Sequence, residues 1–345
     1  MPNRVLLAPL AGIGNWFVRL QAKRYGAGMA VSEMVSSHAI HYRNERTCVE
    51  MLRIDPRERE PAPPIAGGLV SIQLFGEDPQ IMRAAAAHIA AHTDADAIDI
   101  NMGCPVPKVR RTGAGVGMLA NPDLAVAITK AAREGTTQGG CGLPVTVKLR
   151  SGLTPGDESG YELAHRLVAE GGAAAIGFHP RSAAVHHKGV PDYELAARLV
   201  ATLGAPVILT GGLHDAHSTL AAYEQTGAAA VMLARGALGN PWLFEQLLGG
   251  RDLDSAPTRA EVLDELDWTI SRAVEHLGEP RATRYLRKFY PWYVARLELD
   301  PAVAKGLNEA LLAADTLAGV RGLLETHAPR YTGPLATPSA SAVPA

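Results

Sequence analysis

A cysteine with basic residues close behind it is the first candidate for chemistry. Cys104 lies in an Asn-Met-Gly-Cys-Pro segment that begins at Asn101, and Lys108, Arg110 and Arg111 follow shortly after it. Cations near a thiol lower its pKa and make it a usable acid or nucleophile. We therefore take Cys104 as the candidate catalytic residue, with an ordinary small buried cysteine as the alternative interpretation.

Three further polar residues end apolar runs of the sequence. Lys148 is the hardest of them to explain as purely structural, because a lysine that ends a buried apolar strand needs an anionic partner. Gln73 and His179 end two other runs. Taken singly, Gln73 could cap a turn and His179 could be a core histidine. Taken together, the three suggest a phosphorylated cofactor whose ring they flank.

Two short turns could hold the phosphate of such a cofactor. Thr210, Gly211 and Gly212 follow one apolar run, and Ala234 and Arg235 follow another. Backbone N–H groups at glycine turns and helix N-termini bind phosphate in many barrels. The signal is moderately specific, and it places the cofactor phosphate between these two turns.

Histidines and cysteines do not indicate a metal site or disulfides. His214 and His217 lie three residues apart where a helix is expected to begin at Asp215, and no third ligand is near them in the sequence. A tetrahedral zinc site needs at least three protein ligands. The three cysteines are also too few and too scattered for a disulfide framework. We expect a reduced, cytoplasmic protein without a bound metal.

A repeated strand–helix pattern must position these side chains. Eight short apolar runs alternate with helical segments, and several runs are nearly continuous, as in parallel strands covered on both faces. The pattern predicts a (β/α)8 TIM barrel, with functional residues at the C-terminal ends of the strands. A doubly wound sheet is the alternative, but no Gly-x-Gly-x-x-Gly turn follows an early strand. The expected strands are Val5–Leu10, Met29–Met34, Leu69–Phe75, Ala97–Met102, Pro144–Leu149, Ala174–His179, Pro206–Thr210 and Ala229–Ala234.

The pattern changes after the eighth repeat. We expect the barrel to occupy residues 1–248 and a small helical domain to occupy residues 258–328. Thr258 and Glu261 have the spacing of a capping box, which starts the first helix of that domain. The tail, residues 331–345, carries no charge and is predicted to be disordered. The predicted helices of the small domain are Thr258–Leu277, Glu279–Arg296 and Pro301–Thr326.

Charge and composition limit the possible partners. The chain has 345 residues, and its net charge of −2 excludes polyanion binding by bulk charge alone. Residues 281–297, however, contain five cations, five aromatic residues and no acid. In a continuous helix the cations Arg281, Arg284, Arg287 and Lys288 share one face, which favours RNA over a merely solvated surface. No apolar run approaches the roughly 18 residues of a membrane helix, so we expect a soluble protein. We also expect it to be a monomer.

The motifs together resemble those of the tRNA-dihydrouridine synthases. The Asn-Met-Gly-Cys-Pro block carries most of the resemblance, which also includes Gln73-Leu-Phe-Gly and Val147-Lys-Leu-Arg and covers about residues 5–297. It implies an FMN enzyme that reduces the C5–C6 double bond of uridines in tRNA with NADPH. Hydride would pass from reduced FMN to C6, and Cys104 would protonate C5.

The resemblance also implies roles for individual residues. Asn101 would hold the flipped uracil. The flavin contacts would be Pro9, Leu10, Ala11, Gln73, Lys148 and His179, and the phosphate contacts Thr210, Gly211, Gly212, Ala234 and Arg235. We expect the RNA to meet Lys108, Arg110, Arg181, Arg281, Arg284, Arg287 and Lys288.

The chain departs from the family pattern around both predicted phosphate turns and in one loop. Thr210 and Gly212 replace an asparagine and an aspartate, Ala234 replaces a glycine, and the loop after the sixth run lacks the usual arginine, glutamine and tyrosine at Ala183, Val185 and His187. Backbone donors for FMN remain, but the substrate is placed in doubt. Two alternatives therefore stay open. One is a flavin barrel that acts on a free pyrimidine or another small conjugated substrate. The other is an inactive RNA-binding paralogue.

Overall fold

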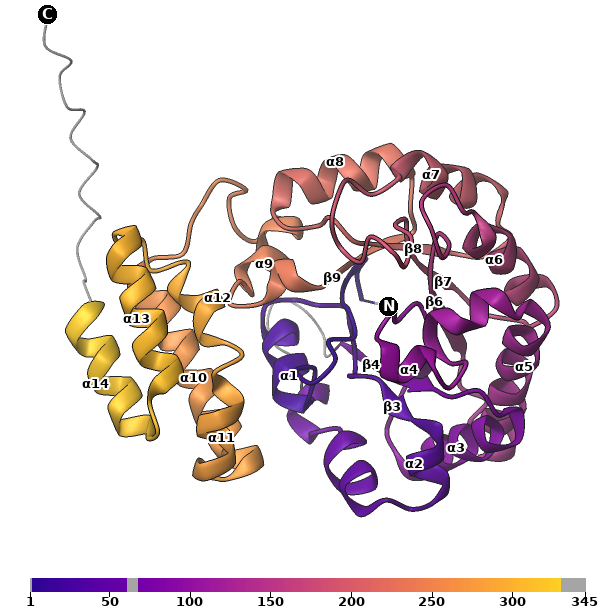
Figure 1. Ribbon diagram of the computed structural model, residues 1–345, viewed down its shortest axis with the longest axis horizontal. Helices are drawn as coiled ribbons and strands as arrows, with labels where there is room; N and C mark the ends of the chain where they lie inside the picture. The colour runs from indigo at the N-terminus through magenta and orange to yellow at the C-terminus, as the bar shows by residue number, and fades with distance from the viewer. Residues whose placement is uncertain (1, 61–67, 330–345) are drawn as a thin grey trace, which may run out of the picture. The chain divides into compact units, whose positions relative to one another are not determined.

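The computed structural model describes residues 2–60 and 68–329 (Figure 1). These residues fall into two compact units that are divided between Ser255 and Ala256. The first unit contains parallel strands and helices, and the second contains helices. The tail predicted to be disordered, residues 331–345, lies outside the described residues.

Eight parallel strands of the first unit close into a barrel, so the predicted fold is confirmed. Neighbouring strands follow chain order, and the pairs β1–β9 and β2–β4 complete the ring. β1 is shorter than predicted because Pro9 has no N–H with which to continue the ladder. The barrel strands are β1 Val5–Leu7, β2 Met29–Val31, β4 Leu69–Phe75, β5 Ala97–Met102, β6 Val145–Arg150, β7 Ile176–His179, β8 Val207–Thr210 and β9 Ala230–Leu233.

A ninth, unpredicted strand lies beside the barrel. The two-residue strand β3, Val35–Ser36, pairs in parallel with the end of β4. Ser36 then caps the short helix α2, Ser37–His41, by accepting a hydrogen bond from the backbone of Ala39. The predicted strand, Met29–Met34, is longer than β2, which ends at Val31 before the polar residues Ser32 and Glu33.

Helices cover the outside of the barrel (Figure 1). Several begin at an aspartate cap; Asp215, for example, accepts from the backbone of Ser218 at the start of α8, as the sequence predicts. None of the helices in the described ranges is long and apolar enough to cross a membrane. The longer helices are α1 Trp16–Arg24, α3 Pro79–His92, α5 Pro122–Gln138, α6 Ser159–Ala169, α7 Tyr193–Thr202, α8 Ala216–Thr226 and α9 Trp242–Leu247.

The interior of the barrel has an apolar half and a polar half. Strands β1, β2, β8 and β9 contribute an apolar cluster that includes Leu6, Met29 and Met232. Strands β4, β5 and β6 instead contribute polar side chains. Their register places Gln73 opposite Asp99 and Asp99 opposite Thr146, with Asn101 opposite Lys148 one layer higher. The polar half therefore includes the predicted site residues Gln73, Asn101 and Lys148.

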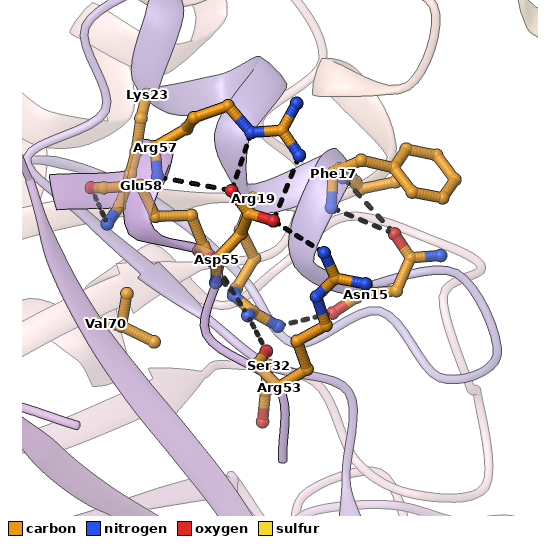
Figure 2. Close-up of polar contacts among 12 residues, drawn as sticks. Asn15, Phe17, Arg19, Lys23, Ser32, Arg53, Asp55, Arg57, Glu58 and Val70 are labelled. Carbon is orange, nitrogen blue, oxygen red and sulfur yellow. Dashed lines mark hydrogen bonds and ion pairs between the residues drawn. The ribbon is translucent and has the colours of Figure 1, made fainter. Parts of the chain in front are cut away.

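A buried ion pair anchors the connection between β3 and β4 to helix α1 (Figure 2). Arg19 and Glu58 are each 1% exposed and form a bidentate pair, with Nε–Oε2 at 2.9 Å and Nη2–Oε1 at 2.8 Å. Arg19 also donates to the carbonyl oxygens of Gly14 (3.3 Å) and Arg53 (2.7 Å). Good geometry with extra hydrogen bonds is the condition under which a buried pair is tolerated.

The second unit contains more helices than the sequence predicts. α10, Arg259–Leu277, begins with the expected capping box of Thr258 and Glu261. The single helix predicted over Glu279–Arg296 is wrong, because Pro291 would lose its backbone bond and clash with the carbonyl of residue 287. The single helix predicted over Pro301–Thr326 is also wrong, because Thr316 caps a new helix there. The observed helices are α11 Glu279–Leu286, α12 Tyr290–Val294, α13 Pro301–Ala313 and α14 Leu317–His327.

Candidate functional site

The barrel brings most of the predicted site residues to one end. Gln73, Asn101 and Lys148 lie near the C-terminal ends of β4, β5 and β6, and His179 and Thr210 are the last residues of β7 and β8. Because the strands are parallel, these ends meet at one mouth. The predicted turns follow other strands at the same end: Pro9, Leu10 and Ala11 after β1, Gly211 and Gly212 after β8, and Ala234 and Arg235 after β9.

A chain of hydrogen bonds connects the strand ends to the Cys104 loop. The Gln73 Nε2 donates to Asp99 Oδ2 at 2.6 Å, and the Asn101 Nδ2 donates to Gln73 Oε1 at 2.9 Å. The Asn101 Oδ1 accepts from the backbone N–H groups of Cys104 (2.9 Å) and Gly103 (3.2 Å). Cys104 is thus held at the mouth through its backbone and through side chains of two strands.

Lys148 places a positive charge at the mouth. No acidic residue in the described part of the chain forms an ion pair with it. In residues 2–60 and 68–329 its ammonium has no hydrogen bond and no ion pair. The pKa of Lys148 is lowered to about 8, mainly by burial and also by Arg150, whereas Asp99 and Cys104 oppose the shift. A desolvated cation in this state favours an anionic ligand.

His179 is neutral at physiological pH. Burial lowers its pKa far below the ordinary value, and Lys148, Arg150, Arg181 and Arg235 add to the effect because each disfavours a further positive charge. The ring can therefore donate from one nitrogen and accept at the other. The His179 Nε2 lies 3.4 Å from the Nη1 of Arg181.

The turn after β8 has the geometry of an anion site. Gly211 and Gly212 have φ values of +96° and +83°, and a Cβ on Gly211 would lie 2.2 Å from the His179 ring. The backbone N–H groups of Gly211, Gly212, Arg235 and Gly236 donate no hydrogen bond within the described part of the chain. Free N–H groups beside a cationic side chain suit a phosphate. The residues present therefore fit a phosphorylated flavin.

Tyr193 occupies the space that a side chain at position 212 would need. A Cβ on Gly212 would lie 2.4 Å from the Tyr193 Oη and 2.7 Å from the Pro191 ring. The Tyr193 Oη donates to the Gly211 carbonyl oxygen at 3.0 Å. The loss of the usual family aspartate is thus accompanied by a tyrosine that supports the same turn.

Arg150 is a structural residue of the site that was not among the predicted site residues. It is 7% exposed, and its Nε donates to the Gly103 carbonyl at 2.9 Å. Its Nη1 donates to the carbonyls of Ser182 (3.1 Å) and His186 (2.6 Å). Arg150 therefore joins the Cys104 loop to the loop after β7. A buried arginine that ends a strand was the available sequence signal.

Arg181 also holds the loop after β7 by donating hydrogen bonds to a backbone carbonyl. Its Nη2 and Nε donate to the Gly189 carbonyl at 2.7 and 3.2 Å. The side chains of His186, His187 and Lys188 are exposed on this loop. Arg181, which the resemblance assigned to RNA, thus has a protein partner at the site.

The cations near Cys104 differ from those that the sequence emphasised. Cys104 is partly buried, and Lys148 and Arg150 interact electrostatically with it. Lys108 and Arg110 lie on the short helix α4, Pro107–Arg110, and are exposed to solvent. Both remain predicted substrate contacts.

The loop that carries the first predicted flavin contacts is tied to the buried ion pair. The Leu10 carbonyl accepts from Ile13 (3.0 Å) and Gly14 (2.7 Å). Gly14 in turn accepts from Arg19. The anchor in Figure 2 thus also holds the loop after β1.

The continuous helix expected to carry the four predicted RNA-binding cations of the second unit is wrong. α11 ends at Leu286, so Arg281 and Arg284 lie on it, Arg287 is its C-cap and Lys288 follows the helix. Arg287 donates to the Ala314 carbonyl and pairs with Asp315 at 3.2 Å. Arg281, Arg284 and Lys288 are exposed.

The aromatic residues of this segment are divided between core and surface. Phe289, Tyr290 and Tyr293 are buried, whereas Trp292 is 36% exposed. Three of the five aromatics in the segment therefore stabilise the helical core. Tyr285 lies under the Lys288 ammonium, which is 4.8 Å from the ring centroid.

Of the two histidines near α8 that the sequence analysis set aside as metal ligands, His217 contacts another residue. His217 forms an ion pair with Asp254 at 2.8 Å, and Asp215 caps the helix. Among the residues that the structure describes, no group of three or more potential ligands could hold a metal ion.

Two solved structures have a similar barrel, and each chain is about twice as long as the region matched. A complex of 2-naphthoyl-CoA reductase has a TM-score of 0.54 at 13% identity, over 75% of this chain and 51% of that one. The 6-hydroxypseudooxynicotine amine oxidase of Pseudomonas geniculata N1 has a TM-score of 0.56 at 13% identity, over 76% and 50%. This chain spans about half the length of each, and the likeness supports the barrel fold.

Sequence relatives identify the family. The proteins called tRNA-dihydrouridine synthase B from Yersinia pestis and Vibrio cholerae are 32% and 31% identical over 95% of this chain and 98% of their own. A probable tRNA-dihydrouridine synthase from Mycobacterium tuberculosis is 34% identical over 89% of this chain and 78% of its own. The family model described as dihydrouridine synthase (Dus) matches residues 6–322. The chain belongs to the dihydrouridine synthase family.

Proposed function

We propose that this protein reduces uridines in tRNA to 5,6-dihydrouridine, with FMN as bound cofactor and NADPH as reductant. The observation that carries the proposal is the mouth itself, where Cys104 and Asn101 lie on one hydrogen-bonded loop beside the cation of Lys148. The names and coverage of the relatives support the same reaction.

The flavin would be held by residues from most of the barrel strands. Gln73, Lys148 and His179 would contact its ring system together with Pro9, Leu10 and Ala11, and Lys148 would stabilise negative charge on it. The N–H groups of the turns at Thr210–Gly212 and Ala234–Arg235 would bind its phosphate. Bound FMN would supply the hydride that is added at C6 of the uracil.

Cys104 and Asn101 would act on the uracil. Cys104 would donate a proton to C5, which would leave a thiolate beside Lys148 and Arg150. Asn101 would hold the base, with its amide orientation fixed by the Cys104 and Gly103 backbone. The target uridine must leave its stack to reach the mouth, which costs a few kcal/mol and favours loops over helices.

The RNA would bind through cations of both units. In the first unit we propose Lys108, Arg110 and Arg181, and in the second unit Arg281, Arg284, Arg287 and Lys288. Phosphate contacts of this kind make binding sensitive to salt.

The test is nucleoside mass spectrometry of unmodified tRNA after incubation with the protein and NADPH. A gain of two hydrogens on uridine at a defined position is the expected result. No gain, although NADPH reduces the bound flavin, would contradict the proposed substrate. Reduction of free uridine or uracil without tRNA would support the small-substrate alternative, and a colourless protein that still binds tRNA would support the inactive paralogue.

A further inference from the structure

The polar half of the barrel interior contains a buried carboxylate, Asp99, that the proposed reaction does not use directly. Asp99 is 3% exposed and lies on β5 between Gln73 and Thr146. Its Oδ1 accepts from the Thr146 Oγ1 and its Oδ2 from the Gln73 Nε2, both at 2.6 Å. Each carboxylate oxygen therefore has a short hydrogen bond, of which one leads to a predicted flavin contact.

The donors and acceptors of this chain can be arranged in one direction only. The backbone N–H groups of Gly103 and Cys104 can only donate, so the oxygen of Asn101 must face them. The amide nitrogen of Asn101 then faces Gln73, whose oxygen must accept. The amide nitrogen of Gln73 is left to face Asp99, which must accept as well. The backbone at one end and the carboxylate at the other fix both amides.

Loss of the Asp99 acceptor would remove one of the two constraints on the Gln73 amide, and only the hydrogen bond from Asn101 would remain to hold it. The buried Gln73 nitrogen would be left without its acceptor, so the side chain would be free to move from the position in which it meets Asn101. Burial raises the pKa of Asp99, whereas its hydrogen bonds from Thr146 and Gln73 oppose the shift. The bond from Gln73 is short, at 2.6 Å, and holds the native orientation of the Gln73 amide.

We propose that Asp99 is a positioning residue of this site. Its carboxylate orients the Gln73 amide, Gln73 orients Asn101, and Asn101 holds the backbone of Cys104. One N–H of Gln73 has no acceptor among the described residues and is left for the flavin. The inference rests on the proposed function, because it assigns Asp99 to the placement of the flavin contact and the proton donor.

The test compares Asp99→Leu with two matched variants. Asp99→Leu keeps the size of the side chain but removes both acceptors. Thr146→Val removes only the other hydrogen bond of Asp99 and leaves its bond to Gln73. Asp99→Asn retains an acceptor for Gln73, because the Thr146 hydroxyl can accept from the new amide nitrogen. If Asp99 acts through Gln73, Asp99→Asn and Thr146→Val should resemble the wild type.

The first readout is the rate at which iodoacetamide alkylates Cys104 in the flavin-free protein, followed by peptide mass spectrometry. Asp99→Leu is expected to change this rate several-fold, while the exposed Cys141 in the same sample reacts as before. The second readout is FMN itself, which we expect to bind about tenfold more weakly and with a shifted visible spectrum. The third is the kcat for dihydrouridine formation, expected to fall roughly ten- to hundredfold.

Several results would overturn the proposal. One is a folded Asp99→Leu protein with wild-type Cys104 alkylation and wild-type flavin spectrum. Another is a Thr146→Val variant that loses as much as Asp99→Leu in every readout, since this would indicate a general structural role. If Asp99→Leu does not fold, Asp99→Ser replaces it, because its hydroxyl is too short to reach both partners. Absence of dihydrouridine in the wild type would instead contradict the proposed function and leave the first two readouts decisive for Asp99.

Discussion

Two lysines in the barrel unit have the same shifted pKa but opposite surroundings. Burial lowers the pKa of both Lys23 and Lys148 to about 8. The Lys23 ammonium donates to the carbonyls of Glu58 (2.9 Å) and Gly68 (2.6 Å), as Figure 2 shows for Glu58. The Lys148 ammonium has no such partner in the residues described. The fold satisfies one cation, whereas the other is left for a ligand.

The same difference extends to the neighbours of each lysine. Around Lys23, the guanidinium of Arg19 meets the carboxylate of Glu58 in a closed pair. Around Lys148, the nearby cations Arg150 and Arg235 share a mouth with a neutral His179. A closed network stabilises the fold, and an open one creates a site for an anion. Burial of charge alone does not distinguish the surroundings of Lys23 from those of Lys148. The groups that contact each ammonium do.

The largest effect is expected at the mouth, from the Cys104→Ala variant. Removal of a general acid costs typically a hundred- to ten-thousandfold in rate, so dihydrouridine formation should be nearly lost. Flavin content should be unchanged, because the thiol is not among the predicted flavin contacts. Cys141→Ala is the matched control and should keep full activity; full activity in Cys104→Ala would refute the acid role.

Substitutions in the buried Arg19–Glu58 ion pair should change the stability of the protein. Arg19→Ala leaves Glu58 buried without its partner and is expected to lower the free energy of unfolding by about 3–5 kcal/mol. Urea unfolding of the flavin-free protein measures this change. The double variant Arg19→Met with Glu58→Met removes both charges and should lose much less. A loss below about 1 kcal/mol for Arg19→Ala would show that the pair is not essential to the anchor.

The two lysines should respond in opposite directions to the same substitution. Lys148→Met removes a desolvated cation with no direct partner, so near neutral pH the flavin-free protein should become more stable and bind FMN about tenfold more weakly. Lys23→Met leaves two carbonyls without their donor and should be destabilising. Thermal unfolding without flavin and FMN titration provide the two measurements. Equal destabilisation by both variants would remove the distinction between them.

The pH dependence of Lys148 gives a smaller, directional test. Its folded pKa of about 8 lies below the ordinary 10.5, so between these values the unfolded chain binds more protons than the folded one. Wild-type stability should therefore rise relative to Lys148→Met as pH increases through this window, and the gain should be complete above it. Urea unfolding of both proteins across the window checks the sign. A stability difference that is independent of pH would contradict the shift.

The smallest effects are expected in the second unit. Arg284→Gln removes an exposed cation and should weaken tRNA binding modestly, with a salt dependence reduced by about one unit of slope. Arg287→Gln should affect binding less and stability more, because Arg287 already pairs with Asp315. Filter binding at several salt concentrations and thermal unfolding separate the two. Equal salt slopes for Arg284→Gln and the wild type would remove Arg284 from the RNA contacts.

Local sequence patterns were sufficient to predict the barrel and several of the residues at its mouth. Continuous apolar runs predicted the eight strands, and the side chains that end them identified Gln73, Lys148 and His179. The helix over 279–296 failed because residue periodicity outweighed Pro291, whose missing N–H breaks the ladder. Pro291 is therefore a stronger indicator of where the helix breaks than the spacing of the cations is of its continuity.

The sequence could not define which groups contact each buried lysine or arginine. The local sequence singles out Lys148 at the end of an apolar run, but it does not show that Lys23 is buried or how its ammonium is satisfied. The carbonyls of Glu58 and Gly68 reach Lys23 from distant parts of the chain. Arg150 is a similar case, because its three carbonyl acceptors lie on two separate loops. The role of such residues depends on contacts across many residues, which only the folded structure provides.

The most direct test of the account is a single turnover. Protein whose flavin has been reduced with NADPH, and then freed of nucleotide, is mixed with unmodified tRNA while flavin absorbance and dihydrouridine are followed in the same sample. The account predicts one dihydrouridine for each flavin oxidised in the wild type, and no dihydrouridine in Cys104→Ala. Flavin oxidation without dihydrouridine in the wild type would show that this mouth reduces another substrate.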